Sequence, residues 1–332
     1  MVSSKSQQLG LSALVAGLLL AAIAAITLFG LLTSRYGWKI YLEVFSHFQL
    51  QYCVICVVLL VLLGLTRRRL MSLLGLFCCS ALLATQILPW YFPPVWLSPR
   101  PQSDLRVLIA NVNTQNQQFE QVLALTRQVQ PDLALFMEVN DVWVSQLNTL
   151  QDILPFSSAE ASPYNFGIAL YSRLALDSPE IVQFSPDSTA SITAAIEVAG
   201  RSLSLVAAHP LPPAKSSFFQ ARNQQLAAMA TYLQSLSAPV LVIGDFNITM
   251  WSPYYKRFIG LTKLKNARQG FGLLPSWPTS GTYRQIPDWA SLLFSVPIDH
   301  CLVSPELRVA SIRTGANIGS DHRPVIVELA AE

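Results

Sequence analysis

The first third of the chain consists of long apolar runs. Leu11 to Thr33 is a run of 23 residues without a charged side chain, enough to cross a hydrocarbon core about 30 Å thick. Two further apolar runs cover residues 48–65 and 70–88. We therefore predict a membrane anchor of residues 1–99 with three transmembrane helices. Glu43 and His47 fall in the connection before the second run, where we expect them to stay in water.

From residue 105 the pattern changes to short apolar runs separated by amphipathic stretches and turns. The runs predict strands at 105–112, 133–139, 167–171, 192–198, 203–208, 240–243, 298–303, 307–314 and 325–329. Helical periodicity is confined to residues 117–129, 142–150 and 216–234. Because many strands are separated by few helices, residues 100–332 are predicted to form one α+β layered sandwich and not a doubly wound sheet.

Charge divides the chain at the same place. Residues 1–99 hold six Lys and Arg residues and a single acid, whereas residues 100–332 hold 16 basic and 18 acidic residues, a net charge of −2. The second part therefore lacks the general basicity of a non-specific nucleic-acid binder. Arg67, Arg68 and Arg69 stand together in the short loop between two apolar runs. The positive-inside rule places this loop in the cytoplasm, and three crossings then place residue 100 onward outside.

Polar and ionisable residues recur at the ends of the predicted strands. A buried strand delivers its last side chains to the edge of the sheet, so residues at several strand ends can meet in one cleft. Most of them alone are explained by a turn, a cap or a surface pair. Glu138 is a stronger signal, because a carboxylate after an unbroken apolar run is partly dry and favours a cation as partner. Their joint presence in one domain indicates a site, and the set comprises Asn111, Asn113, Glu138, His209, Asp245, Asn247, Asp299, Asp321 and His322.

The order of these residues closely resembles the endonuclease/exonuclease/phosphatase superfamily. The matching strings are Ala-Asn-Val-Asn at 110–113, Phe-Met-Glu-Val at 136–139, Ala-His-Pro at 208–210, Gly-Asp-Phe-Asn at 244–247, Ile-Asp-His at 298–300 and Gly-Ser-Asp-His-Arg-Pro at 319–324. The resemblance spans residues 105–329. It implies a deoxyribonuclease-like four-layer α/β/β/α sandwich and cleavage of phosphate esters that depends on Mg²⁺ or Mn²⁺.

The resemblance also implies a role for each matching residue. Asn111 and Glu138 would be metal ligands, and Asn113 a third ligand at a position where other members often carry an acid. His322 would be general base or phosphate contact, oriented by Asp299 or Asp321. Asp245 would hold the attacking water. Asn247 and His209 would contact the phosphate oxygens.

The sequence leaves the substrate open. Apolar spans before such a domain resemble the bacterial membrane-anchored branch of the superfamily, which implies a multi-pass protein of the plasma membrane with an extracytoplasmic domain. We expect a phosphohydrolase, a phosphatase or phosphodiesterase, that acts on a lipid-linked or small phosphate ester. The alternatives are an extracytoplasmic endonuclease or exonuclease, which requires a nucleic-acid partner, and a membrane-anchored binding module without activity.

One further stretch bears on the partner. Five cations and no acid lie between residues 256 and 268, and aromatic residues recur between 251 and 289. The cations are either an ordinary solvated face or a contact for an anionic substrate or lipid. Some of the aromatic residues are expected in the core, and others at a rim that faces lipid. The cations are Lys256, Arg257, Lys263, Lys265 and Arg268, and the aromatic residues include Trp251, Tyr254, Tyr255, Trp277 and Trp289.

Overall fold

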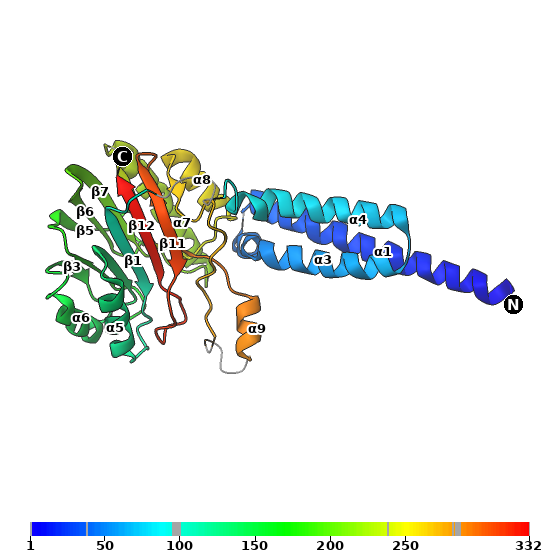
Figure 1. Cartoon of the computed structure of the whole chain (residues 1–332), viewed down its shortest axis with the longest axis horizontal. Helices are drawn as coiled ribbons and strands as arrows, with labels where there is room; N and C mark the ends of the chain where they lie inside the picture. Colours follow the sequence, from blue (N-terminus) through cyan, green and yellow to red (C-terminus); the bar gives the residue numbers. More distant parts are fainter. Residues whose placement is uncertain are drawn as a thin grey trace. The chain divides into compact units, whose positions relative to one another are not determined.

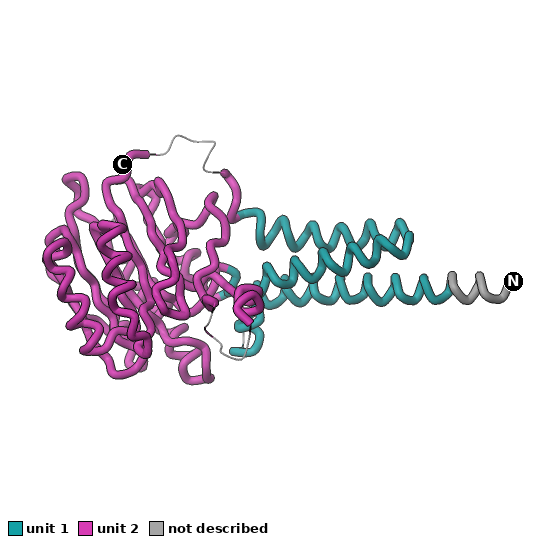
Figure 2. Tube along the Cα trace, turned by 60° about the horizontal axis from the view of Figure 1, so that its bottom comes forward, with its two compact units in different colours: residues 1–89, 251–253 teal, residues 90–250, 254–332 magenta. Residues whose placement is uncertain are grey.

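The computed structural model describes residues 2–37, 39–94, 101–237, 239–280, 282 and 287–331, with only the backbone described for residues 2–9. The chain divides into two compact units (Figure 2). Unit 1 comprises residues 1–89 and 251–253, and unit 2 comprises residues 90–250 and 254–332.

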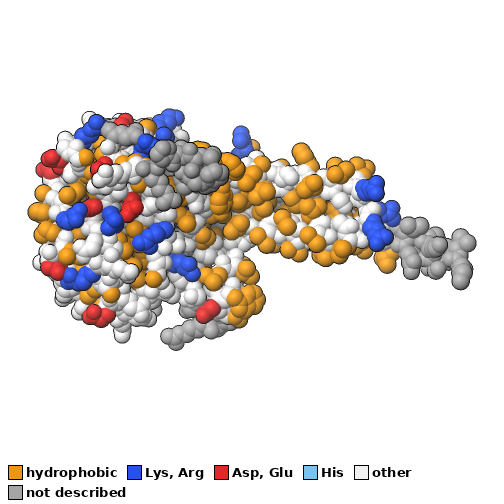
Figure 3. Space-filling model, viewed as in Figure 1, with side chains coloured by type: hydrophobic (Ala, Val, Ile, Leu, Met, Phe, Trp, Pro, Cys, Tyr) orange, Lys and Arg blue, Asp and Glu red, His pale blue; other side chains and the backbone are white. Residues whose placement is uncertain are grey.

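Unit 1 is built from apolar helices. Its main helices are α1 (Val2–Arg35), α2 (Ile40–Phe45), α3 (Gln49–Leu65) and α4 (Arg69–Leu82). Three helical stretches of the described chain are long and apolar enough to cross a membrane, namely Gly10–Arg35, Ile40–Leu65 and Arg69–Trp90. The three predicted apolar helices are therefore present. Figure 3 shows their apolar side chains, with cations near one end of the bundle.

Glycines bring the helices of unit 1 close together. A Cβ atom built on Gly75 would lie 3.1 Å from the side chains of Leu60 and Leu63, so a larger residue there would push α4 away from α3. Leu11 and Leu65 line one shallow surface hollow. The first part of α1 therefore lies beside the turn between α3 and α4, which carries Arg67.

The expectation that Glu43 and His47 stay in water is wrong. The Glu43 side chain is fully buried and His47 is 7% exposed. Their closest approach is 3.5 Å, from His47 Nε2 to Glu43 Oε2. Glu43 lies on α2 and His47 on the 3-10 helix Ser46–Phe48 that follows it, and both segments pack against α1.

The described residues of unit 2 form two six-stranded sheets. The first sheet has the order β11-β12-β1-β2-β4-β3 and the second the order β5-β6-β7-β8-β10-β9. The strands of the first sheet are β1 (Leu105–Asn111), β2 (Leu133–Met137), β3 (Phe156–Glu160), β4 (Ile168–Ser172), β11 (Leu307–Thr314) and β12 (Val325–Ala331). Those of the second are β5 (Asp177–Val182), β6 (Ser191–Val198), β7 (Arg201–Ala208), β8 (Val240–Asp245), β9 (Lys265–Asn266) and β10 (Asp299–Val303).

Each sheet has a parallel pair at its centre. In the first sheet β1 and β2 are parallel, and in the second β7 and β8 are parallel. Antiparallel strands flank both pairs: β12 and β4 in the first sheet, and β6 and β10 in the second. One helix connects the two strands of each pair, α5 (Phe119–Val129) in the first sheet and α7 (Ser216–Ser235) in the second, and makes the crossover that a parallel pair requires.

The central strands are buried on both faces. Leu105, Val107 and Ile109 of β1 belong to the core between the two sheets, whereas Leu108 and Ala110 pack on the opposite side. That outer core includes Trp143 of α6 (Asp141–Leu147). Burial on both faces explains why these strands read as unbroken apolar runs and not as an alternating pattern.

The layers are helices, first sheet, second sheet and helices (Figure 1). The helices α5 and α6 cover the first sheet, and α7 carries buried Leu226 and Met229 on the side of the second. The predicted four-layer sandwich is confirmed. The sequence interpretation missed β3, β5, β9, α8 (Pro253–Thr262) and α9 (Asp288–Leu293), which are short or largely exposed and so leave no buried apolar run.

Candidate active site

Four predicted site residues continue the inward face of the central strands. Side chains alternate along a strand, and Ile109, Ala207, Ile243 and Cys301 all belong to the core between the sheets. Two residues away on the same faces, at the strand ends, stand Asn111, His209, Asp245 and Asp299. All four are at least 98% buried. The period of the strands thus directs them into the space between the sheets at one edge of the sandwich.

The second sheet holds its two carboxylates side by side. Asp299 on β10 is the direct antiparallel partner of Asp245 on β8. Gly244 has a φ of 149°, and a Cβ atom there would lie 1.8 Å from the carbonyl oxygen of Ala208 on β7. Only glycine combines this dihedral angle with so close an approach of two backbones. The glycine of the Gly-Asp-Phe-Asn string therefore fixes where Asp245 leaves the strand.

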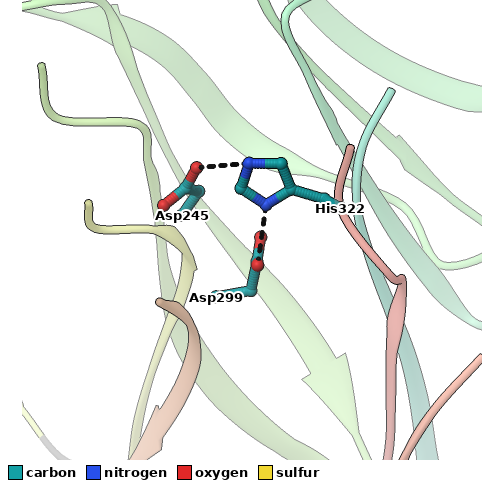
Figure 4. Close-up of side chains that lie close together, drawn as sticks. All are labelled: Asp245, Asp299 and His322. Carbon is teal, nitrogen blue, oxygen red and sulfur yellow. Dashed lines mark hydrogen bonds and ion pairs between the residues drawn. The ribbon is translucent and has the colours of Figure 1, made fainter. Parts of the chain in front are cut away.

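His322 joins these two carboxylates from a loop before β12 (Figure 4). Its Nδ1 atom lies 2.9 Å from Asp299 Oδ2, and its Nε2 atom lies 3.6 Å from Asp245 Oδ2. The Ser320 hydroxyl donates to the Asn111 carbonyl at 2.7 Å and accepts the His322 backbone N–H at 3.0 Å. Of the two candidates for orienting the imidazole, the structure places Asp299 in contact.

Glu138 stands next to this cluster in a strained backbone conformation. Its φ is 60°, which is uncommon for a residue other than glycine and costs of order 1–3 kcal/mol. Its Oε1 atom accepts a hydrogen bond of 2.9 Å from Asn111 Nδ2, and the same amide group donates to Asp245 Oδ2 at 3.2 Å. The buried Oε2 atom has no hydrogen-bond partner among the described residues.

His209 and Asn247 extend the site on the second sheet. His209 Nε2 lies 3.6 Å from Asp245 Oδ2 and 3.4 Å from Asn247 Nδ2. The Asn247 backbone N–H donates to Asp245 Oδ1 at 2.8 Å, and φ of Asn247 is 52°. The buried Nδ1 atom of His209 has no hydrogen-bond partner in the described part of the chain. The second sheet thus gathers one carboxylate, one amide and one imidazole within bonding reach.

Asn113 and Asp321 form the rim of the site. Asn113 Nδ2 donates to Asp321 Oδ1 at 2.8 Å, and Trp277 Nε1 donates to Asp321 Oδ2 at 3.1 Å. The side-chain oxygen of Asn113 accepts the Gln115 backbone N–H at 2.9 Å. Both carboxylate oxygens of Asp321 are therefore engaged away from His322. The metal-ligand role suggested for Asn113 stays a prediction.

Burial and the dense carboxylates shift the ionisation of the site. Burial raises the pKa of Glu138 to about 7 against the opposing effects of Asn111 and His322. Burial alone lowers the pKa of His322, but the nearby Asp299 and Asp245 outweigh it and raise that pKa to about 10. Burial raises the pKa of Asp245 well above its usual range, and burial lowers that of His209 to about 4. The site therefore contains an imidazolium between two acids and a second, neutral imidazole.

The residues present fit a hard divalent cation beside Glu138. A buried carboxylate oxygen without a partner is costly, and an ion would remove that cost. Oxygen donors are the ligands that Mg²⁺ prefers, and this ion keeps part of its water shell. Asp245, Asp299 and His322 also lie within 4.8 Å of one another at their ligand atoms. In that group the imidazole already faces both carboxylates, so Glu138 and Asn111 remain the better-suited holders of an ion.

Several residues that support the site give no clear signal in the sequence. Arg222 on α7 is fully buried and donates from Nη1 to the Asn247 carbonyl at 3.0 Å. Ser276 accepts the backbone N–H of Asp299 at 3.4 Å. Trp277 fixes Asp321, although its position before Asp299 in the sequence marks it only as part of a family pattern.

The predicted five-cation cluster needs a correction. Arg268 is fully buried, and burial lowers the pKa of its guanidinium to about 10 against the opposing effect of Asp299. The sequence pattern groups it with surface cations because it follows β9, a strand of only two residues that the pattern does not reveal. The other four are exposed: Lys256, Arg257, Lys263 and Lys265. Among the nearby aromatic residues, Tyr255 is buried against His300, whereas Trp289 is 67% exposed.

The fold and the donor set together define a deoxyribonuclease-like sandwich with acids, amides and imidazoles at one edge. Residues 108–322 match the endonuclease/exonuclease/phosphatase family, and the chain belongs to that family. Its members are hydrolytic nucleases and phosphatases that generally use divalent metals. No curated protein matches the chain by sequence.

Solved structures confirm the fold. TDP2 from D. rerio, in complex with a single-strand DNA product, is 15% identical, with 68% of this chain and 99% of that chain covered and a TM-score of 0.58. The catalytic domain of human Nocturnin with a bound sulfate is 18% identical, with coverages of 69% and 94% and a TM-score of 0.55. The 3′ phosphatase NExo from Neisseria, bound to a product DNA hairpin, is 18% identical, with coverages of 68% and 99% and a TM-score of 0.54.

Proposed function

We propose that this protein is a membrane-anchored, Mg²⁺-dependent phosphoester hydrolase that acts on a lipid-linked or small phosphate ester. The observation that carries the proposal is the meeting of Glu138, Asp245, Asp299 and His322 at one edge of the sandwich, in a chain that also has three helices of membrane-spanning length. A complete set of donors argues against a binding module that has lost its activity.

In this proposal the ion is held by Glu138 and Asn111. When bound, Mg²⁺ supplies positive charge that stabilises the phosphate oxygens as negative charge grows on them. The choice of Glu138 rests on its unpartnered Oε2 atom and on its place beside the His322 cluster. Asn113 is a further ligand only if its side chain turns away from Asp321.

The chain's own residues divide the remaining work. Asp299 fixes the ring of His322 through Nδ1 and favours its protonated form, so Nε2–H is a donor to a non-bridging phosphate oxygen. Asp245 is the better proton acceptor for the attacking water, because it is buried and His322 is already charged. Asn247 and neutral His209, both beside Asp245, add donors to the phosphate.

The membrane orientation is a second part of the proposal. Arg67 and Arg68 lie in the turn between α3 and α4, and Arg69 begins α4, at the same end of unit 1 as the first part of α1. The positive-inside rule places that end in the cytoplasm of a bacterial cell and unit 2 outside it. A C-terminal reporter that is active only outside the cytoplasm is expected to be active, and a reporter active only in the cytoplasm would overturn the orientation.

A nuclease is the second candidate, because two of the similar structures are complexes with DNA products. The test is a substrate panel applied to the purified full chain, with and without a chelator. The panel contains lipid phosphates, inositol phosphates, single-stranded and double-stranded DNA, and a soluble aryl phosphodiester. The proposal predicts chelator-sensitive turnover with the fastest rate on a lipid phosphate. Faster turnover of DNA would support the nuclease, and no turnover of any substrate would leave the binding module.

A further inference from the structure

Helix α9 carries the densest group of exposed large apolar side chains in the described part of unit 2. Its sequence continues into Phe294, and we name Trp289, Leu292, Leu293 and Phe294 the α9 patch. These side chains are 67%, 44%, 58% and 53% exposed, in that order. Figure 3 shows apolar side chains gathered over this helix. Clustered exposed apolar surface on a soluble domain marks a contact with a protein or a membrane.

The patch lies on one side of a helix whose other side is anchored. Residues three and four apart share a helical face, which places Leu292 and Leu293 with Trp289. Ser291, on the other side, is fully buried. The apolar residues therefore project outward because the buried side fixes the helix, and not because the helix lacks a defined orientation.

Both ends of the connection that contains α9 are bonded to the active site. Trp277 and Val296 pair as an isolated antiparallel bridge, and Trp277 also holds Asp321. Thr279 donates its backbone N–H to the Asp321 carbonyl at 2.9 Å. After Val296 the chain reaches Asp299 within three residues. The α9 patch is thus carried by a connection whose two ends reach the rim of the active site.

The same connection also contributes to a polar groove. The groove has a volume of about 420 Å³, and Thr279 and Ser280 line it together with Asn113 and Asp321 at the rim of the site. One connection therefore presents hydroxyl groups to the groove and, further along, large apolar side chains to the solvent. An amphiphile has the same division between a polar head and an apolar tail.

The short connection between the membrane-length helices and β1 indicates that the nearby apolar partner is a lipid bilayer. Fourteen residues separate the end of the third membrane-length stretch at Trp90 from β1, and fully extended they reach at most about 50 Å. A bilayer that holds those stretches is then always within reach of unit 2. Tryptophan is the side chain most typical of the membrane interface, and Trp289 is the most exposed member of the patch.

We propose that the α9 patch inserts into the interfacial layer of the lipid bilayer and docks the active site on membrane-embedded phosphate esters. This inference rests on the proposed function in one respect, the identity of the substrate. Insertion itself needs no catalysis, because it depends on the apolar surface that the patch removes from water. The patch follows Asp288 and contains no cation, so zwitterionic lipid suffices.

The first experiment measures insertion directly. The full chain and a Trp289→Phe variant are reconstituted into phosphatidylcholine nanodiscs with plain or brominated acyl chains, and the difference in their fluorescence isolates Trp289. We expect a blue-shifted emission that brominated lipid quenches by about half or more and that a water-soluble quencher does not reach. An emission typical of indole in water, indifferent to bromine, would overturn the proposal.

The second experiment measures the consequence for turnover. A triple variant, Trp289→Ser with Leu292→Ser and Phe294→Ser, is compared with a control, Val142→Ser with Ile181→Ser, which removes exposed apolar side chains from α6 and β5. We expect the triple variant to lose about tenfold on a long-chain phosphodiester in vesicles and to keep its rate on a soluble aryl phosphodiester. The control is expected to keep both rates.

The remaining outcomes separate the two proposals. Equal loss on both substrates would show that the patch supports the fold of the site, and would overturn membrane docking. If the wild type is a dimer whose Trp289 is not quenched by lipid, and the triple variant is a monomer, the patch would be assigned to a second copy of the chain. If the wild type hydrolyses neither substrate, the proposed function fails, and the quenching experiment still decides the inference on α9.

Discussion

The two sheets of unit 2 share one plan but end in different chemistry. Each has a parallel pair between two antiparallel strands, and in each pair the strands end at the same edge of the sandwich. The first sheet delivers Asn111 and Glu138 there, whereas the second delivers His209 and Asp245. Under the proposed function, the first sheet holds the cation, and the second sheet supplies the groups that face the phosphate and the attacking water.

His322 connects the two halves. It precedes β12 of the first sheet, yet its ring faces Asp299 and Asp245 of the second. The Asn111 amide, within 3.4 Å of His322 Nε2, completes the link. Neither sheet contains a complete site. We therefore expect substitutions in the first sheet to weaken Mg²⁺ binding and substitutions in the second sheet to lower kcat.

The largest effect is expected on the first sheet, for Glu138→Gln. This change removes the negative charge beside the unpartnered Oε2 position, so Mg²⁺ affinity falls by more than about 100-fold and kcat/KM by about 10⁴-fold. Calorimetric titration of the full chain and turnover of an aryl phosphodiester measure the two quantities. The control is Glu180→Gln on the exposed strand β5. Unaltered Mg²⁺ affinity in the Glu138→Gln variant would contradict the division between the sheets.

The next effect is expected on the second sheet, for Asp245→Asn. The amide still accepts the Asn247 N–H but takes a proton poorly, so kcat falls by about 10³-fold. Mg²⁺ affinity is expected to stay within about threefold of the wild type, because the proposed ligands Glu138 and Asn111 belong to the other sheet. A loss of affinity as large as that of Glu138→Gln would mean that Asp245 is itself a main ligand.

A smaller effect is expected where the sheets are joined. Asp299→Asn removes the anion that orients His322, and kcat is expected to fall roughly 10- to 100-fold. Asp321→Asn, whose parent carboxylate is bonded to Asn113 and Trp277, is the matched comparison and is expected to lose less. In a double-mutant cycle with His322→Ala, the Asp299 change is expected to add almost nothing. Full additivity would refute the pairing.

The smallest effect concerns how stability depends on pH, through a buried histidine inside the second sheet. His300 on β10 is fully buried, donates to the Ile248 carbonyl at 2.8 Å and faces Asn266, and burial lowers its pKa to about 3. The unfolded chain binds this proton below about pH 6.5 and the folded chain does not. Its contribution is therefore complete above about pH 6.5 and decreases as the pH falls toward 3, by about 1.4 kcal/mol per unit.

The variant His300→Gln keeps a donor for Ile248 but cannot titrate. Between about pH 7 and pH 5, its melting temperature in detergent is expected to fall by about 5 °C less than that of the wild type. Thermal unfolding followed by tryptophan fluorescence measures the difference. If the melting temperatures of the two proteins fell equally as the pH decreased, His300 would not contribute to the loss of stability in acid.

Much of the fold is predictable because the central strands are buried on both faces. The run from Leu133 to Met137 and the run from Val240 to Ile243 are apolar without interruption, and both are strands. The exposed edge strands β3 and β5 contain few buried positions, so no pattern marks them. Helix α9 is missed for the related reason that its apolar residues point outward.

The site residues are predictable as a group but not in their pairing. Strand period leads to Asn111, Asp245 and Asp299, because each continues an inward face beyond the outermost core residue. The partner of His322 does not follow from the sequence, since Asp321 is adjacent in the chain while Asp299 is adjacent in space. That choice depends on the loop held by Ser320, whose path the sequence pattern does not specify.

The most direct test of the account is a Mg²⁺ titration of turnover with metal-stripped full chain and a soluble phosphodiester. We expect no hydrolysis without the ion and saturable activation by Mg²⁺ in the wild type. The Mg²⁺ concentration at half-maximal activity is expected to shift strongly in Glu138→Gln. In Asp245→Asn that concentration is expected to stay unchanged while the maximal rate is low. Hydrolysis that persists in the presence of chelator, or two variants with identical titration curves, would contradict a single site built jointly by the two sheets.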